Sequence, residues 1–230
     1  MKIFIRKCLN FIKKNIMLKK TQKAFDKYCL HNKIKKLHLG AGTINLDTWF
    51  NTDLSPKVNE KIYYLNMLKI PYFFDDNTFD YIFSEHNFEH FTLEELYKIL
   101  KECIRVLKPD GIIRIAIPDL NKIIKFYQEE NTTNTQYKEW GIKTFIPFAH
   151  EKKLKNKAIV LNNFFRDWGH KFIYDYETIY DLLKVCGYKE ITECKISKSR
   201  HKDLTNIENH WKVIGKNYNN LETMIIEAKK

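Results

Sequence analysis

Residues 37–42 read Leu-His-Leu-Gly-Ala-Gly, a short apolar run that leads directly into a pair of glycines. An apolar run of this length is typical of a buried strand. Glycines that follow a strand let the backbone turn tightly and approach a ligand, because they carry no Cβ atom. Taken alone, the pair predicts only a turn, so the segments around it decide its meaning.

Strand-like and helix-like segments alternate along the chain. A helix is predicted to begin at the capping box Thr92–Glu95 and to end before Pro109. Further helices are predicted over 120–127 and 176–186, the second ended by Gly187. Alternation of this kind builds right-handed βαβ units. We therefore expect an α/β fold with a doubly wound, mostly parallel sheet, helices on both faces and seven strands, at 36–39, 50–53, 62–65, 79–84, 112–117, 191–196 and 211–214.

In such a sheet a ligand binds outside the carboxyl ends of the strands, where the strand order reverses. Several polar or small residues fall at these ends, namely the glycine pair, Asp53, Asn66 and the segment 84–86. A dinucleotide-binding loop would carry a third glycine where Asn45 stands, and an acidic residue about 20 positions further on. Asp53 comes too early for that pattern. Pyrophosphate binding is therefore poorly supported.

Five segments, in this order, resemble the class I S-adenosylmethionine-dependent methyltransferases: 37–42, 49–53 (Trp-Phe-Asn-Thr-Asp), 79–82 (Phe-Asp-Tyr-Ile), 88–91 (Phe-Glu-His-Phe) and 105–111 (Arg-Val-Leu-Lys-Pro-Asp-Gly). Within that family the chain is similar to a small branch associated with bacterial surface-glycan biosynthesis. The resemblance is strongest from residue 35 to about 130 and continues loosely through 169–175. It implies a Rossmann-like methyltransferase sheet that takes S-adenosylmethionine and releases S-adenosylhomocysteine.

The resemblance also implies which residues bind this donor. Gly40 and Gly42 would pass beneath its methionine and ribose parts, and Asp53 would accept hydrogen bonds from the ribose hydroxyls. Asn66 would face the adenine amino group, and the strand end at 84–85 would lie beside the reacting methyl group. The full expected set is His38, Gly40, Ala41, Gly42, Asp53, Leu54, Asn66, Met67, Ser84 and Glu85.

Two positions depart from the family pattern. His38 stands where many members carry an acid, and Ile44 replaces a frequent third glycine. Each of these two departures is compatible with weaker binding of the donor or with a domain that has lost its activity. The competing hypothesis is therefore a catalytically inactive, methyltransferase-like binding module that recruits a partner through its N-terminal helix.

A hydroxyl acceptor must lose its proton during methyl transfer, and a neutral histidine suits that task. We expect His86, directly after the fourth strand, or His170, in a Trp-Gly-His turn, to be the general base. The alternative for each is a structural histidine. For Glu89 and His90 we favour a packing role. No cluster of carboxylates indicates a magnesium site, so we expect no required metal; a metal site assembled from residues far apart in the sequence is the alternative.

The segment 131–173 is rich in aromatic and basic residues and is expected to select the acceptor. It would form a lid over a sugar, a sugar phosphate or a nucleotide sugar, with aromatic faces for stacking and cations for phosphate. A packed helical insert with a solvated basic face is the alternative. The predicted activity is O-methylation of a carbohydrate precursor of a surface glycan.

Charge is concentrated at one end of the chain. The 230 residues carry a net charge of +12, yet residues 1–36 hold twelve Lys and Arg against one acid, Asp26. The nearly neutral remainder argues against a nucleic-acid partner. We expect a basic amphipathic helical segment at 1–34 followed by a methyltransferase domain at 35–230. Residues 1–30 would either contact anionic lipid or dock on the domain.

The location of the protein is predicted from what the sequence does not contain. It has no apolar run long enough to span a membrane and no credible secretory signal. Its five cysteines are odd in number and widely spaced, which favours a reducing compartment. We expect a cytoplasmic protein, with peripheral contact at the inner face of the membrane as an extension of that hypothesis.

Overall fold

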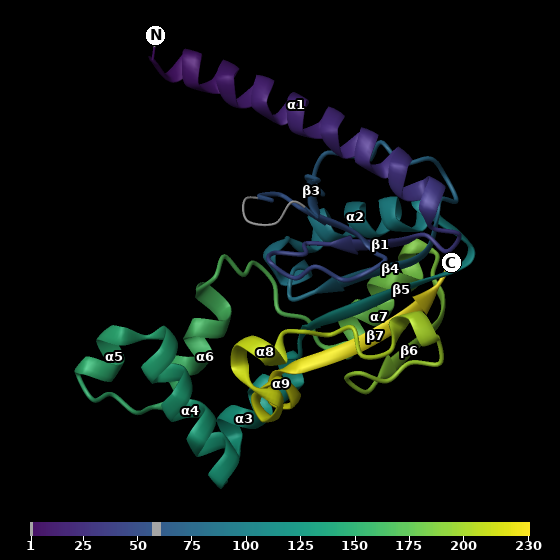
Figure 1. The fold of residues 1–230 in the computed structure, drawn as a ribbon. Helices are drawn as coiled ribbons and strands as arrows, with labels where there is room; N and C mark the ends of the chain where they lie inside the picture. Colours follow the sequence, from purple (N-terminus) through teal and green to yellow (C-terminus); the bar gives the residue numbers. More distant parts are fainter. Residues whose placement is uncertain (1, 57–60) are drawn as a thin grey trace.

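A computed structural model of the chain describes residues 2–56 and 61–230, with side chains from residue 13 onward. Its centre is a seven-stranded sheet (Figure 1), in the order β3-β2-β1-β4-β5-β7-β6. The strands are β1 (Lys36–Leu39), β2 (Phe50–Asp53), β3 (Ile62–Tyr64), β4 (Phe79–Glu85), β5 (Leu107–Pro118), β6 (Lys189–Cys194) and β7 (Thr223–Lys229). β7 runs antiparallel to β5 and β6, and the other pairs are parallel. The predicted seven-stranded, mostly parallel sheet is confirmed.

One predicted strand was wrong. Residues 211–214 form a short helix, α8 (Trp211–Ile214), and the seventh strand is the C-terminal segment 223–229. Periodicity cannot separate a short apolar helix turn from a short strand. The strand at this place in the sheet is determined by tertiary pairing, because β7 lies between β5 and β6 and hydrogen-bonds to both.

Three helices cover one face of the sheet: α1 (Lys2–His31), α2 (Leu93–Val106) and α7 (Tyr176–Cys186). α2 begins at the predicted capping box, in which the Thr92 hydroxyl accepts from Glu95 N and the Glu95 carboxylate accepts from Thr92 N. α7 ends at Gly187, whose φ of 101° requires a residue without a Cβ. These helices bury their apolar sides against alternate residues of β4, β5 and β7.

The C-terminal part of α1 belongs to the core of the domain. Phe25 packs edge-on against Phe50 and Phe74, and the Thr21 hydroxyl donates to Tyr64 O at 3.1 Å. The N-terminal part extends beyond the sheet (Figure 1). The side chains of residues 2–12, which carry most of the predicted apolar stripe, lie outside the described residues. Contact of this helix with lipid stays a prediction.

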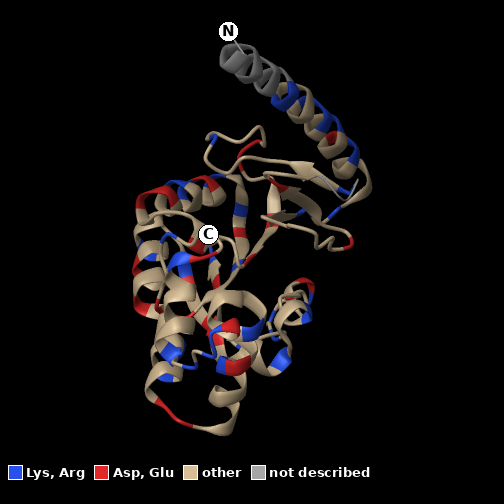
Figure 2. Cartoon of the chain, turned by 90° about the vertical axis from the view of Figure 1, so that its left-hand side faces the viewer, with Lys and Arg blue, Asp and Glu red and all other residues tan. Residues whose placement is uncertain are grey.

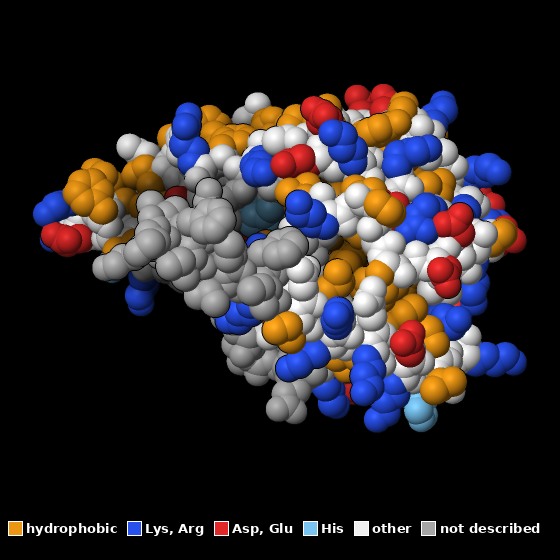
Figure 3. Space-filling view, turned by 90° about the horizontal axis from the view of Figure 1, so that it is seen from above, with side chains coloured by type: hydrophobic (Ala, Val, Ile, Leu, Met, Phe, Trp, Pro, Cys, Tyr) orange, Lys and Arg blue, Asp and Glu red, His pale blue; other side chains and the backbone are white. Residues whose placement is uncertain are grey.

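Charge on the body is mixed in sign. Basic and acidic segments alternate over the domain, while the described part of α1 is mostly basic (Figure 2). Seen from above, Lys and Arg side chains are spaced among hydrophobic and acidic ones rather than gathered in one stripe (Figure 3). Among the described residues, no helix combines the length and the apolar character needed to cross a bilayer.

The other face of the sheet is covered by the segment 195–210, which includes the short helix η2 (Lys202–Leu204), and by Trp49. Arg114 of β5 points into this layer and is fully buried. Its guanidinium contacts the carboxylates of Glu208, at 2.5 Å, and Glu227. This network explains how a charged residue fits in a central strand.

A separate helical layer lies beyond the carboxyl ends of the strands (Figure 1). It contains α3 (Leu120–Gln128), α4 (Thr132–Phe145), α5 (Pro147–Glu151), α6 (Lys157–Arg166), α8 and α9 (Lys216–Glu222). Most of it comes from the predicted acceptor segment 131–173. It has its own apolar core, centred on Phe126, Tyr137 and Phe164. The segment is thus a packed helical insert that also bounds a cavity, described below.

Replacing Arg114 with methionine should destabilise the fold strongly, because two buried carboxylates would lose their common cation. We expect the free energy of unfolding to fall by about 3–5 kcal/mol in urea titrations. Lys108→Met, which breaks a partly exposed pair with Asp80, is the matched control and should cost about 1 kcal/mol or less. Equal losses in the two variants would contradict the structural role of Arg114.

His38 should make stability depend on pH. Burial lowers its pKa to about 4, against the opposing effects of its hydrogen bond with Asn51 and the charge of Asp53. The unfolded chain therefore takes up this proton first as pH falls. The stabilisation is complete above about pH 6.5 and is lost between there and pH 4.

The measurement compares the free energy of unfolding of the wild type with that of His38→Asn at pH 7 and pH 5. The difference between the two proteins should shrink by about 2 kcal/mol at the lower pH. A difference that does not change with pH would show that His38 is not held neutral in the fold.

Candidate active site

The glycine loop lies at the carboxyl end of β1, between β2 and β4. Gly40 and Gly42 have φ values of 68° and 55°. Ala41 N donates to Thr52 O at 2.9 Å, and Gly42 N donates to the Asp53 carboxylate at 2.9 Å. The loop is therefore tied to the end of β2, as the sequence predicts for Gly40, Ala41, Gly42 and Asp53.

The two glycines are needed for different reasons. A Cβ on Gly40 would lie 2.3 Å from the side chain of Asn87, so this position requires glycine to let Asn87 approach. A Cβ on Gly42 would meet nothing within 4 Å. The loop is thus open at Gly42, next to the half-buried Asp53, and this open side can receive a ligand.

The polar groups at this edge fit an adenosyl sulfonium donor. The Asp53 carboxylate accepts from Gly42 N and from Ser55 N, at 2.7 Å, and each oxygen keeps a further lone pair for a ribose hydroxyl. Leu54 beside it is 55% exposed, which offers an apolar surface to a base. Asn66 Oδ1 accepts from Leu68 N at 3.0 Å and retains a second lone pair.

Three of the predicted donor-binding residues are placed differently. His38 is 2% exposed and hydrogen-bonds to Asn51, which in turn holds the loop at Leu46. Ser84 is buried and donates to Leu39 O. The Glu85 carboxylate accepts from the backbone N–H groups of 209 and 210. These residues support the loop and the neighbouring segment from within.

The strand β4 ends in a turn that separates two spaces. His86 has a φ of 43°, a left-handed conformation that costs energy in a residue other than glycine. Asn87 places its amide over Gly40, 3.3 Å from the Ser84 hydroxyl and 3.6 Å from Met67 Sδ. His86 lines a cavity instead. Asn87 therefore faces the glycine loop, and its neighbour His86 faces the cavity.

This cavity has a volume of about 300 Å³ and lies beneath the helical layer. Aromatic side chains form its walls: Tyr137, Trp140, Phe145, Phe164 and Trp168. Six histidine and glutamate side chains line the polar part: His86, Glu89, His90, His170, His210 and Glu222. A mainly apolar cavity with a few convergent polar groups is typical of a small-molecule site.

Glu89 lies between the two histidines predicted to be the base. It belongs to the short helix η1 (Phe88–His90) and is 1% exposed. His86 Nδ1 is 3.5 Å from its carboxylate, and His170 Nε2 is 3.9 Å away. The structure thus brings His86 and His170 together around a residue that we had expected only to pack.

The electrostatic surroundings of the two histidines differ. Burial alone would lower the pKa of His86, but the nearby carboxylates of Glu89, Glu222 and Glu85 raise it above its ordinary value. Burial lowers the pKa of His170. Its Nδ1 lies 2.7 Å from Phe164 O, and because a carbonyl oxygen only accepts hydrogen bonds, Nδ1 carries a proton and donates. His170 Nε2 is therefore the lone-pair nitrogen when the ring is neutral.

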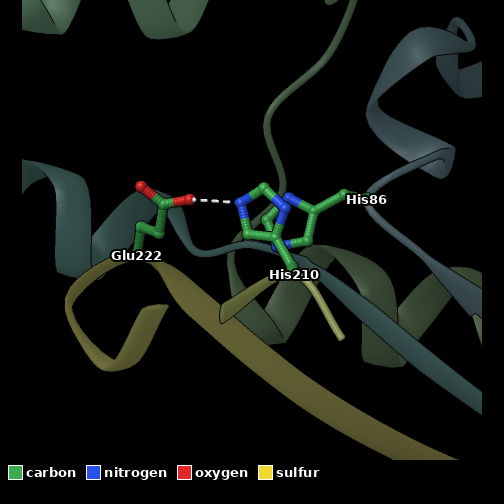
Figure 4. Close-up of side chains that lie close together, drawn as sticks. All are labelled: His86, His210 and Glu222. Atoms are coloured by element: carbon green, nitrogen blue, oxygen red, sulfur yellow. Dashed lines mark hydrogen bonds and ion pairs between the residues drawn. The ribbon is translucent and has the colours of Figure 1, made fainter. Parts of the chain in front are cut away.

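His210 and Glu222 complete the site. The His210 ring stacks on that of His86 with centroids 3.6 Å apart, and its Nε2 lies 3.1 Å from the Glu222 carboxylate (Figure 4). Tyr137 donates to the other Glu222 oxygen. No local sequence pattern indicated these residues, and the segment around His210 was expected to lead into a strand.

Several solved structures show low-level similarity to the chain. A SAM-dependent methyltransferase from Archaeoglobus fulgidus is 16% identical, with a TM-score of 0.47 and 94% of each chain covered. A possible histamine N-methyltransferase from Thermotoga maritima is 14% identical, with a TM-score of 0.46, and the match covers 100% of this chain and 99% of that one. At such values the likeness carries no argument about the acceptor. Among curated proteins, no match to the chain was found.

A family model supplies the firmer comparison. Residues 35–115 match the model described as a methyltransferase domain. The match includes the glycine loop, Asp53 and the turn at His86, and it ends before the helices that wall the cavity. Over these residues the match agrees with the predicted methyltransferase domain.

Proposed function

We propose that the protein transfers a methyl group from S-adenosylmethionine to a hydroxyl of a carbohydrate-type acceptor bound in the cavity. A sugar, a sugar phosphate or a nucleotide-sugar precursor of a surface glycan is the acceptor class we favour. The observation that carries the proposal is the turn at residues 86–87. At this turn the side chain of Asn87 lies over Gly40 of the glycine loop, and the side chain of His86 lines the cavity.

The lining of the cavity supports an acceptor of this class. Sugar rings present C–H groups that pack on aromatic faces such as those of Trp140 and Trp168. Their hydroxyls would meet the polar side chains on the His86 side. The aromatic walls also exclude water, which would otherwise compete as an acceptor.

The hydrogen-bond network selects one nitrogen of His86 for proton transfer. The Thr223 hydroxyl donates to Asn219 Oδ1 at 2.9 Å, so it accepts from His86 Nε2–H at 3.0 Å. This assignment follows from the partners, since hydrogens are placed by the network. Nδ1 then carries the lone pair and can take the proton of an acceptor hydroxyl, while Glu89 would stabilise the resulting imidazolium.

The donor supplies an electrophilic methyl group on a sulfonium: the O–CH₃ bond forms, the S–CH₃ bond breaks, and S-adenosylhomocysteine is released. In this scheme the chain holds the donor with the glycine loop and Asp53, and it orients the acceptor with the cavity walls. Alignment of the two reactants would supply most of the rate enhancement over the uncatalysed reaction. His86 receives the single proton that leaves the acceptor.

Asp53→Asn should weaken binding of S-adenosylhomocysteine, because the neutral amide replaces a charge-assisted acceptor for the ribose hydroxyls. We expect a loss of roughly 10- to 100-fold in affinity by titration calorimetry. Asp75→Asn, an exposed carboxylate away from the loop, is the control and should bind like the wild type. Unchanged affinity in Asp53→Asn would count against the predicted donor site.

His86→Ala should lower turnover by roughly 10²- to 10⁴-fold while the affinity for S-adenosylhomocysteine changes little. The assay follows incorporation of labelled methyl from S-adenosylmethionine into a panel of sugars, sugar phosphates and nucleotide sugars. His150→Ala, an exposed histidine of α5, serves as the control. The proposal fails if no member of the panel is methylated, or if His86→Ala turns over at the wild-type rate.

A further inference from the structure

The Glu89 carboxylate lacks the partners that a buried carboxylate needs. Both of its oxygens are inaccessible to solvent, and neither has a hydrogen-bond partner among the described residues. The two nearest histidine nitrogens, His86 Nδ1 and His170 Nε2, stand at 3.5 and 3.9 Å, which are distances of long ion pairs rather than of normal hydrogen bonds. A buried charge without close hydrogen bonds is costly unless a cation or a hydrogen-bond donor completes it. The carboxylate faces the cavity, so the missing partner would lie there.

Two histidines complete a set of ligand atoms around this carboxylate. One ligand atom each from Glu89, His90 and His170 can be chosen so that all three lie within 4.8 Å of one another. Donor atoms about 2.0–2.1 Å from a tetrahedral ion are roughly 3.3 Å apart. The separation of 3.9 Å between His170 Nε2 and Glu89 therefore needs only a small adjustment to close around an ion.

The backbone and a second hydrogen bond aim His170 at this point. Lys171 N and Phe172 N both donate to the main-chain oxygen of Glu89, which ties the two segments together. His170 Nδ1–H donates to Phe164 O at 2.7 Å, so Nε2 keeps its lone pair toward Glu89. A metal-binding histidine is commonly oriented by such a bond to a carbonyl.

A second group in the same cavity is less suited to a cation. His86, His210 and Glu222 also lie close together, but most of their ligand atoms are already engaged. His86 Nε2 bonds to Thr223, His210 Nε2 to Glu222, and the other Glu222 oxygen to Tyr137. In the described part of the chain, by contrast, neither Glu89 oxygen has a hydrogen bond, and His170 bonds through Nδ1, which leaves Nε2 open.

We propose that Glu89, His90 and His170 bind a divalent first-row transition-metal ion, of which Zn²⁺ is the type case. Two imidazoles and one carboxylate are a ligand set for such ions, and three protein ligands leave coordination positions open. These positions face the cavity, beside His86. The proposed site corresponds to the alternative of a metal held by residues far apart in the sequence. Metal binding itself does not depend on the proposed function. Only the role of the ion, which would be to hold an acceptor oxygen near the base, rests on the proposed function.

The experiment titrates the metal-stripped full-length chain with Co²⁺, whose visible absorption reports coordination, and then displaces it with Zn²⁺. The wild type should bind one Co²⁺ per chain. Glu89→Gln, His90→Gln and His170→Gln should each weaken binding by more than the roughly 10- to 100-fold typical of losing an outer partner. His210→Gln, from the other group, should bind Co²⁺ as the wild type does.

Binding of S-adenosylhomocysteine to each variant checks that it is folded, because the donor edge lies apart from these ligands. It also separates this proposal from the proposed function, since metal binding is read without turnover. Absence of stoichiometric Co²⁺ binding by the wild type would overturn the proposal. So would retention of binding in the three ligand variants, or a loss confined to His210→Gln.

Discussion

The pairing of β1 with β4 is the constraint on which the rest of the site depends. The two parallel strands are in register at Leu39 and Ser84, so their carboxyl ends stop side by side. The glycine loop leaves one strand and the 86–90 segment leaves the other. Because β2 and β5 lie on opposite sides of this pair, the chain leaves the sheet in opposite directions here, and a crevice can form between the loops.

The turn at His86 converts this shared edge into two spaces. His86 ends β4 in a left-handed conformation, and from this turn Asn87 reaches Gly40 while His86 lines the cavity. The following turn of η1 places Glu89 on the same side as His86.

Much of the fold was predictable because local sequence patterns specify it. Strand periodicity, the capping box at Thr92 and the terminating Gly187 all act within a few residues, and the structure has each of them. The seventh strand was misplaced because its identity depends on partners far along the chain. The buried Arg114 shows the same limit, since its two carboxylates come from residues 208 and 227.

The candidate site was predictable to a smaller extent. Gly40, Gly42 and Asp53 follow strands directly, so their position at the edge could be read from the sequence. His38 has the same location along the chain, but the alternation of β1 turns its ring beneath the loop. Glu222 and His210 reach the cavity only through tertiary folding, because Glu222 is the last residue of α9 and Glu85 anchors the backbone of His210.

The unpaired carboxylate of Glu89 had no sequence signal either. An acidic residue beside a histidine in an aromatic-rich segment is compatible with packing, with a base–acid pair and with a ligand set. Its burial and the convergence of His90 and His170 are the observations behind the proposed ligand set, and both are properties of the folded chain.

The most direct test of the account is a crystal structure of the chain with S-adenosylhomocysteine. We expect the ribose at Asp53, the methionine part along Gly40–Gly42, and the sulfur directed past residues 86–87 toward the cavity that holds Glu89. A product molecule bound elsewhere, or a sulfur directed away from that cavity, would contradict the division into a donor edge and an acceptor cavity.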